Sequence, residues 1–407
     1  MSFHVLSREE SAAGGWFEAL LEHITSARTV ATCSTADFII PGIDPLNAHY
    51  PRYAAILAAR GGPDAFFNER QQRMSRIWAL LESPSLLPSL SQSQHVLLFD
   101  LESSHVPSSA LCHHRKMQLP FAERLVHCSI ASSKSNYRVG VDISFPGVIP
   151  ESLGDESHTR VPTERRPVLM SFKGVCSHPV RKPLYALHNG DDIVMVDATQ
   201  ERQPAELRRM LGRQDYQYPD LSAASQFVVC PTGDDVYSFR FVEALSCGAI
   251  PVIFGDGWVL PFSELTDVDY DRFAVLMAEA DAPSTAQRLR AISVAEKRAL
   301  RAEGARVFEQ YFATISAQLD AVVTILSARV RAAGQCSKAA WRIQTPNGGT
   351  EEGPQIEESA HHESGGGDLR TFSACSWPAV TRRRRTTGRA GCSTSFRVRV
   401  VRDAAPR

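Results

Sequence analysis

The chain has 407 residues, a length that predicts two or three domains. Its hydrophobic fraction of 43% and charged fraction of 22% are those of an ordinary globular protein that can bury a sizeable core. The formal net charge is −1, but residues 336–407 carry 12 Lys or Arg against 7 Asp or Glu, a balance of +5 that leaves −6 on the rest. An acidic body of this kind argues against nucleic acid as the main partner.

Cysteine spacing and hydropathy disfavour two further classes of protein. None of the nine cysteines forms a CxxC pair, so the sequence predicts no zinc cluster. Cys230 and Cys247 lie in apolar contexts and are predicted to be inert core residues. The sequence leaves open whether Cys112 and Cys128 pair in an oxidising compartment. No run of 18 or more apolar residues predicts a membrane span, and residues 1–15 lack the pattern of a signal peptide.

Residues 1–150 alternate strands with helices, which predicts a parallel sheet in an N-terminal α/β domain. The apolar side chains between positions 16 and 24 follow the 3.6-residue period of a helix. The polar, proline-containing stretch 151–167 predicts a linker. The elements expected before this linker are helices at 16–30 and 65–81 and strands at 38–41, 95–100 and 139–145.

Residues 168–330 predict a second α/β domain with a long closing helix. Apolar runs indicate its strands, and an Ala-, Arg- and Leu-rich region indicates its helix. Residues 331–407 lose all apolar periodicity and are predicted to be a disordered basic tail, with a basic interaction arm as the alternative. The expected elements are strands at 168–172, 193–196, 227–230 and 250–254 and helical structure at 286–326.

The segment 226–264 is the most informative part of the chain. An apolar strand ends in a Pro-Thr-Gly turn that contains Gly233, a short helix follows, and a second apolar strand ends in Gly-Asp-Gly. In an α/β sheet, a loop that opens a helix at the carboxyl end of a strand is where phosphates and nucleotides bind. Arg240 and Glu243 are three residues apart and share a helix face. The sequence therefore predicts Arg240 as a diphosphate ligand and Glu243 as an acceptor from ribose hydroxyls, with a surface ion pair as the alternative.

The same segment resembles the signature of exostosin-type glycosyltransferases (glycosyltransferase family 47). SFRFVEAL, GAIPVIF and GWVLPFSE carry the resemblance within it. TADFIIPG, NYRVGVDISFP, LMSFKG and RKPLYALHNGDDIVMVD are similar to earlier segments of the family, and FEQYFATISAQLDAVVTILSARV to its closing helix. These segments occur in the family's order and cover about residues 16–330.

The resemblance implies a GT-B type α/β fold, with two Rossmann-like domains that face a nucleotide-sugar cleft. It implies that Lys173 and Arg181 line the diphosphate pocket, with solvated loop charges as the alternative. Gly233 and Ser238 belong to the loop predicted to bind the donor, unless Ser238 only caps its helix. Basic side chains then replace a metal, and Asp267-Val268-Asp269 is expected to be a surface turn rather than a metal site. An inverting transfer also needs a base from the N-terminal domain, for which Asp100 and Asp142 are the candidates.

The implied function is the inverting, metal-independent transfer of a sugar from a UDP-sugar to a glycan or glycoprotein acceptor, in protein glycosylation or polysaccharide biosynthesis. UDP-glucuronate is one donor candidate, because the motifs lean towards the heparan-type exostosins. The alternatives are a catalytically inactive pseudo-transferase that acts as a partner subunit and a glycan-binding module. No cofactor beyond the donor is expected, and homo- or hetero-oligomers are left open. The family implies the Golgi lumen, although its usual N-terminal anchor is absent from this sequence, for which a truncated gene product is the preferred explanation.

Overall fold

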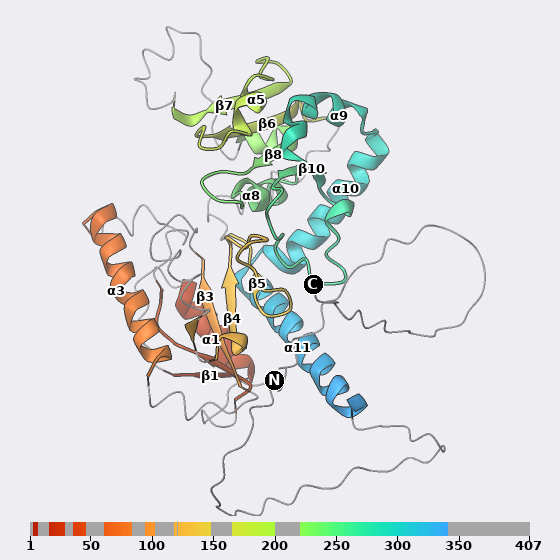
Figure 1. Ribbon diagram of the computed structural model, residues 1–407. Coiled ribbons are helices and arrows are strands. Elements are labelled where there is room, and N and C mark those ends of the chain that lie inside the picture. Colours follow the sequence, from red (N-terminus) through yellow and green to blue (C-terminus); the bar gives the residue numbers. More distant parts are fainter. Residues whose placement is uncertain are drawn as a thin grey trace, which may run out of the picture.

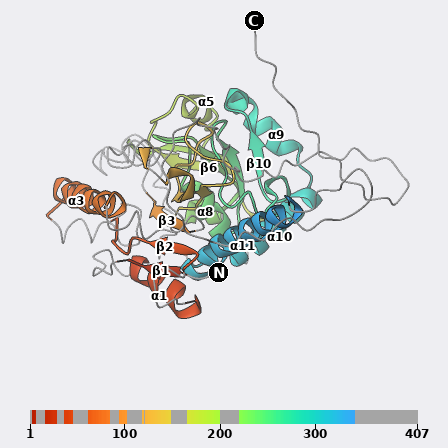
Figure 2. The ribbon, with the colours of Figure 1, turned by 60° about the horizontal axis from the view of Figure 1, so that its bottom comes forward.

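The structure, a computed structural model, forms two α/β domains, the first around β1–β5 and the second around β6–β10 (Figure 1). Helix α11 starts beside the second domain and runs along the first (Figure 1). Figure 2 places α1 beside α11 and α3 away from both. The structure describes residues 3–6, 16–28, 36–45, 61–83, 94–101, 118–119, 121–147, 165–199 and 220–340.

The first sheet is parallel and its strands lie in the order β1-β2-β3-β4-β5. Alternate residues of its strands point to opposite faces, so Leu97 and Phe99 pack towards α1 and α11, whereas Val96 and Leu98 pack towards α3. Both faces are therefore covered, as parallel sheets require. The elements are β1 (Phe3–Val5), α1 (Trp16–Arg28), β2 (Phe38–Ile40), α3 (Pro63–Leu81), β3 (His95–Asp100), the 3₁₀ turn η4 (Ala122–Arg124), β4 (Leu125–Ser129) and β5 (Ile143–Ser144).

The second sheet is also parallel, with the strand order β10-β9-β8-β6-β7. Its first two strands in the chain are β6 and β7, so the chain reverses direction across the sheet between β6 and β8. In doubly wound sheets, ligands bind outside the carboxyl ends of the strands at such a switch point. The elements are β6 (Val168–Gly174), α5 (Arg181–Tyr185), β7 (Ile193–Asp197), α7 (Asp220–Ala223), β8 (Ser225–Pro231), α8 (Arg240–Ser246), β9 (Ile250–Phe254), η9 (Tyr270–Arg272), β10 (Val275–Met277) and η10 (Glu279–Ser284).

The closing helical region is broken into several pieces. It comprises α9 (Thr285–Ala291), α10 (Val294–Val307), the π-helical turn η11 (Phe308–Phe312) and α11 (Ile315–Ala340). The chain bends by 84° between the α10–η11 segment and α11. The Ser293 side chain accepts a hydrogen bond from the Glu296 N–H (3.2 Å) and so starts α10.

Helix α11 belongs structurally to both domains. Its apolar side chains share one core cluster with α1 and with α8, and His23 of α1 lies 3.1 Å from Asp320 of α11. The structure differs from the predicted domain boundary at residue 330 in two respects. The helix packs on the N-terminal domain, and it continues to Ala340, into the predicted tail. The remainder of that tail, like most of the 151–167 linker, lies outside the described residues.

The predicted α/β class with two parallel-sheet domains is confirmed. Strands β3 and β9 coincide with the predicted 95–100 and 250–254. The strand predicted at 139–145 is wrong, because only Ile143–Ser144 pairs with β4 and the residues before it form turns. Within the described part of the chain, no single helix is long and apolar enough to cross a membrane, and only the bent α10–α11 pair passes that test jointly.

Candidate active site

The loops at the carboxyl ends of the two sheets contact each other. The Val259 N–H, in the loop after β9, donates to the Ser132 carbonyl in the loop after β4 (2.9 Å), and the Lys134 N–H donates back to the Gly257 carbonyl (2.8 Å). Lys134 Nζ also donates to the Asp256 carbonyl (2.5 Å). The carboxyl edges of both sheets therefore face each other, which puts the switch point of the second sheet opposite the first domain.

Arg181, the first residue of α5, joins the two loops that flank the switch point. Its Nε donates to the Thr232 carbonyl (2.9 Å), its Nη1 to the Val175 carbonyl (2.5 Å) and its Nη2 to the Pro231 carbonyl (3.4 Å). Its guanidinium also lies 5.1 Å from the centre of the Phe172 ring. Burial lowers the pKa of Arg181 below its ordinary value. Each of its three nitrogens bonds a backbone carbonyl, so Arg181 positions these loops.

Gly233 makes the approach of Arg181 possible. A Cβ atom at Gly233 would lie 2.6 Å from Nη2 of Arg181, a separation that side chains essentially never show. Gly233 and Arg181 were both predicted as donor-binding residues. That role stays a prediction, and the geometry shows that both residues hold the shape of the loop after β8.

Arg240 and Glu243 form the ion pair that their spacing predicts. Arg240 Nη1 donates to the Glu243 carboxylate, and Arg240 Nε donates to the Lys173 carbonyl at the end of β6 (3.2 Å). The side chains are 24% and 13% exposed, so the pair is half-buried rather than a surface pair. Lys173 itself lies within β6 and is buried. Arg240 and Glu243 therefore bring one cation and one carboxylate to the switch point, beside the backbone of Lys173.

Helix α8 is too short to act as a strong anion site by itself. It has seven residues, its N-cap is Phe239, and it has no side-chain cap. A short helix sums few peptide dipoles, so the side chains must provide most of the charge that a diphosphate needs. Ser238 precedes the N-cap and is buried, and it does not cap the helix. Its predicted contact with the donor stays a prediction.

Asp100 is part of a buried ion cluster in the first domain. Its Oδ1 accepts from Arg70 Nη2 (2.7 Å), and its Oδ2 lies 3.8 Å from His127 Nε2. Burial acts to raise the pKa of Asp100, but Arg70 and His127 together hold it well below its usual value of 3.8. A carboxylate with this pKa is a poor proton acceptor at neutral pH. The base role predicted for Asp100 is therefore not supported by its geometry, which fits a structural role.

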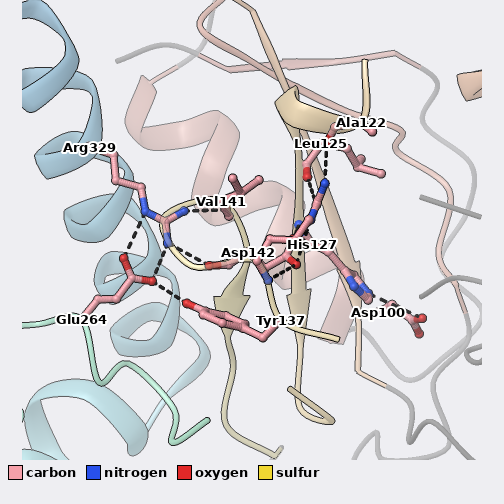
Figure 3. Close-up of polar contacts among 10 residues, drawn as sticks. Asp100, Ala122, Leu125, His127, Tyr137, Val141, Asp142, Glu264 and Arg329 are labelled. Carbon is pink, nitrogen blue, oxygen red and sulfur yellow. Dashed lines mark hydrogen bonds and ion pairs between the residues drawn. The ribbon is translucent and has the colours of Figure 1, made fainter. Parts of the chain in front are cut away.

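Asp142 is equally engaged (Figure 3). It is 2% exposed, and its carboxylate accepts from the His127 N–H (3.2 Å), the Arg138 N–H (3.0 Å) and the Arg138 guanidinium (2.5 Å). Arg138 in turn donates to the carbonyls of Ala122 and Leu125 (2.5 Å each). A buried carboxylate with this many donors holds the turn between β4 and β5, so the base role predicted for it gains no support either.

A contact that the sequence did not reveal joins α11 to both domains (Figure 3). Arg329 donates to the carbonyls of Val141 (2.5 Å) and Asp142 (2.8 Å) in the first domain. It also pairs with Glu264, in the segment after β9, whose carboxylate accepts from the Tyr137 hydroxyl (2.7 Å). We call Arg329, Glu264 and Tyr137 the interdomain clamp. Nothing local marks Arg329 in the sequence, because two of its partners are backbone carbonyls almost 190 residues away.

The cysteines follow the sequence predictions where the structure describes them. Cys230 and Cys247 are buried free thiols, as predicted, and burial raises the pKa of Cys247 to about 11. Cys128 is also a buried free thiol, and Cys112 lies outside the described residues. No group of three or more His, Cys, Asp or Glu side chains in the described part of the chain could hold a metal ion. Asp267 instead accepts from the Tyr311 hydroxyl.

Comparison with known proteins identifies this arrangement. The model of the exostosin GT47 domain matches residues 95–292, a range that runs from β3 to the end of α9 and includes the switch point. The chain carries an exostosin-type glycosyltransferase domain. This confirms the resemblance drawn from its motifs.

Its relatives are exostosins of animals. The chain is 32% identical over 219 residues to the exostosin-1 homolog of Caenorhabditis elegans, a match that covers 49% of this chain and 56% of that protein. It is 29% identical over 227 residues to exostosin-1b of Danio rerio, covering 51% of this chain and 30% of that protein. The matched region therefore spans little more than half of the one relative and less than a third of the other.

Solved structures with a similar chain path are more distant. Anabaena Alr3699/HepE in complex with UDP-glucose matches 80% of this chain and 100% of its own, with a TM-score of 0.40 and 12% identity. The apo structure of OtsA matches 80% of this chain and 99% of its own, with a TM-score of 0.36 and 13% identity. These values are too low for any inference about ligands.

Proposed function

We propose that this exostosin-type protein transfers a sugar from a UDP-sugar to a glycan or glycoprotein acceptor, with inversion and without a metal ion. The observation that carries the proposal is the Arg240–Glu243 pair, which is bonded to the Lys173 carbonyl at the switch point of the second sheet, within the matched GT47 domain. UDP-glucuronate is the donor that we test first, beside the UDP-sugars of galactose, xylose and arabinose.

The charges at the switch point fit a nucleoside diphosphate. Arg240 supplies a cation where negative charge develops on the departing UDP. Glu243 lies one turn into α8 and is held by Arg240, so its second oxygen is oriented to accept hydrogen bonds from vicinal ribose hydroxyls. In this proposal the diphosphate of the bound donor replaces the Glu243 carboxylate as the partner of part of the Arg240 guanidinium.

Measurements of UDP binding and of turnover distinguish the roles of Arg240 and Glu243. Arg240→Ala is expected to slow turnover about 100-fold, a cost of about 2.7 kcal/mol in the transition state. Glu243→Gln is expected to weaken UDP binding with a smaller effect on the chemical step, because its contact is the same before and during reaction. Arg288→Ala and Glu309→Gln, at exposed positions on α9 and η11, serve as matched controls.

The assays are UDP titration by calorimetry and UDP release with each donor and an oligosaccharide acceptor. Unchanged UDP affinity in Glu243→Gln, with the fold intact by its melting curve, would refute the assignment of the ribose contact. Absence of UDP binding by the wild type would refute the proposed function as a whole.

One observation favours the second candidate, a pseudo-transferase that binds UDP without turnover. Both predicted bases, Asp100 and Asp142, are buried and engaged in internal bonds. Neither of these two carboxylates is therefore available to accept the proton of the acceptor hydroxyl. UDP binding without release of UDP from any donor, across the same panel of acceptors, would favour this candidate.

A further inference from the structure

Phe239 presents an unusual exposed ring at the candidate site. Among the described residues, the aromatic side chains with exposed rings are Phe67 (38%) and Phe239 (37%). Phe67 lies on α3, in the first domain, whereas Phe239 is the N-cap of α8 and directly precedes Arg240. Exposing the apolar area of a ring to water is unfavourable, and this ring lies beside the cation that we propose as a diphosphate ligand.

The ring of Phe239 is held in place from two sides. The Tyr237 ring, which is buried, stands perpendicular to it with the centroids 4.7 Å apart. A Cβ atom on Gly147 would lie 3.4 Å from Cδ1 of Phe239, so the rim of the ring lies beside the backbone that follows β5. A side chain fixed in this way loses little further conformational entropy when a ligand covers it. Phe239 is therefore a rigid apolar surface between the two domains.

We propose that Phe239 is the platform on which the pyranose ring of the donor sugar stacks, an inference that rests on the proposed function. The C–H groups on one face of a pyranose form an apolar surface that packs on aromatic rings, while its hydroxyls bond polar groups at the rim. Val175, in the loop after β6 at the same edge of the sheet, is also exposed (39%). The site thus combines a cation for a diphosphate with an apolar surface for a sugar ring.

Position along the donor favours the sugar over the nucleobase. Phe239, the N-cap of α8, lies beside Gly147 of the first domain, whereas Glu243 lies one turn further along α8 in the second domain. With the ribose at Glu243 and the diphosphate at Arg240, the next group in line towards the first domain is the transferred sugar. The base then extends in the opposite direction, away from Phe239.

The test compares the affinity for UDP with the affinity for UDP-sugars, measured by calorimetry on the full chain. Phe239→Ala is expected to weaken binding of UDP-glucuronate or UDP-galactose about tenfold and to leave the affinity for UDP within about twofold, consistent with the loss of one aromatic stacking contact. Phe239→Leu keeps an apolar side chain without the flat ring and should lose most of the same gain of about tenfold in affinity for the UDP-sugar. Phe239→Trp should retain it, and Phe67→Ala, equally exposed but remote, should change neither affinity.

Each other outcome overturns the assignment. Equal weakening of UDP and UDP-sugar in Phe239→Ala and Phe239→Leu would show that the ring contacts the nucleotide. Unchanged donor affinities with a raised KM for the acceptor would show that it contacts the acceptor instead. Unchanged values throughout would show that the ring contacts neither substrate. A wild-type chain that fails to bind UDP would refute the proposed function, which this inference presupposes, and is a different result from any of these.

Discussion

The interdomain clamp yields the prediction with the largest expected effect on stability. The change is Arg329→Met, which keeps an unbranched apolar stem on α11 and removes the guanidinium. Arg329 is 8% exposed and donates to two carbonyls of the first domain, those of Val141 and Asp142, and to the carboxylate of Glu264 (Figure 3). The methionine leaves both carbonyls and the carboxylate without these donors.

The magnitude follows from these contacts. A hydrogen bond from a charged donor contributes about 1.5–3 kcal/mol, and two such bonds to buried carbonyls are lost. The pair with Glu264 adds less, because that carboxylate is 33% exposed and solvent screens the interaction. We expect a loss of about 3 kcal/mol in the free energy of unfolding, a factor of about 100 or more in the folding equilibrium.

Equilibrium unfolding in urea, followed by tryptophan fluorescence and by circular dichroism, measures this loss. The matched control is Arg331→Met, two residues further along α11 and exposed, which should change stability by less than about 0.5 kcal/mol. A double-mutant cycle that combines Arg329→Met with Glu264→Gln measures the interaction energy of the Arg329–Glu264 pair itself. If Arg329→Met is no less stable than Arg331→Met, the clamp does not hold the domains together and the reasoning is wrong.

Two further changes test other parts of the structure. Gly233→Ala places a methyl group against Nη2 of Arg181 and should lower the free energy of unfolding by about 1–3 kcal/mol and weaken UDP binding. The control Gly257→Ala should be tolerated, because its Cβ would only touch Val236 at 3.7 Å. Equal melting temperatures for the two variants would contradict the packing argument. The pKa of Asp100 is lowered by folding, so its stabilising contribution is complete above about pH 4 and is lost on acidification below that value. Asp100→Asn should therefore be much less stable than the wild type at neutral pH, and the difference should narrow as the pH falls below about 4 in urea unfolding. A difference in stability that stays constant over that range would show that the carboxylate does not titrate with folding.

The strands of this fold could be predicted where an apolar run is continuous. The runs at 95–100 and 250–254 lie at buried positions of parallel sheets, and their limits agree with β3 and β9. β1 and β10 have three residues each and are not among the predicted strands, although the equally short β2 is. The break before α10 did have a signal, since Ser293 and Glu296 have the spacing of a capping box.

The candidate site was predictable only where its contacts are local. Arg240 and Glu243 pair because they are three residues apart on one helix, a relation that the sequence contains. The roles of Arg181 and Asp142 depend on backbone carbonyls and amides brought near by the fold. Arg181, for example, bonds carbonyls some 50 residues away. The sequence alone does not distinguish a charged side chain that bonds the backbone from one that binds a ligand.

The path of α11 has a consequence for how the chain is made. The apolar side of α1 packs on residues of α11 such as Leu319 and Val322, which are synthesised about 300 residues later. The first domain therefore cannot complete its core during translation until nearly all of the second domain has left the ribosome. In the interval Phe17, Leu20 and their neighbours are exposed to chaperones and to aggregation, as is usual for contacts of long sequence separation. A nascent chain stopped before residue 315 should accordingly be a chaperone client, even though each of its strands has already been made.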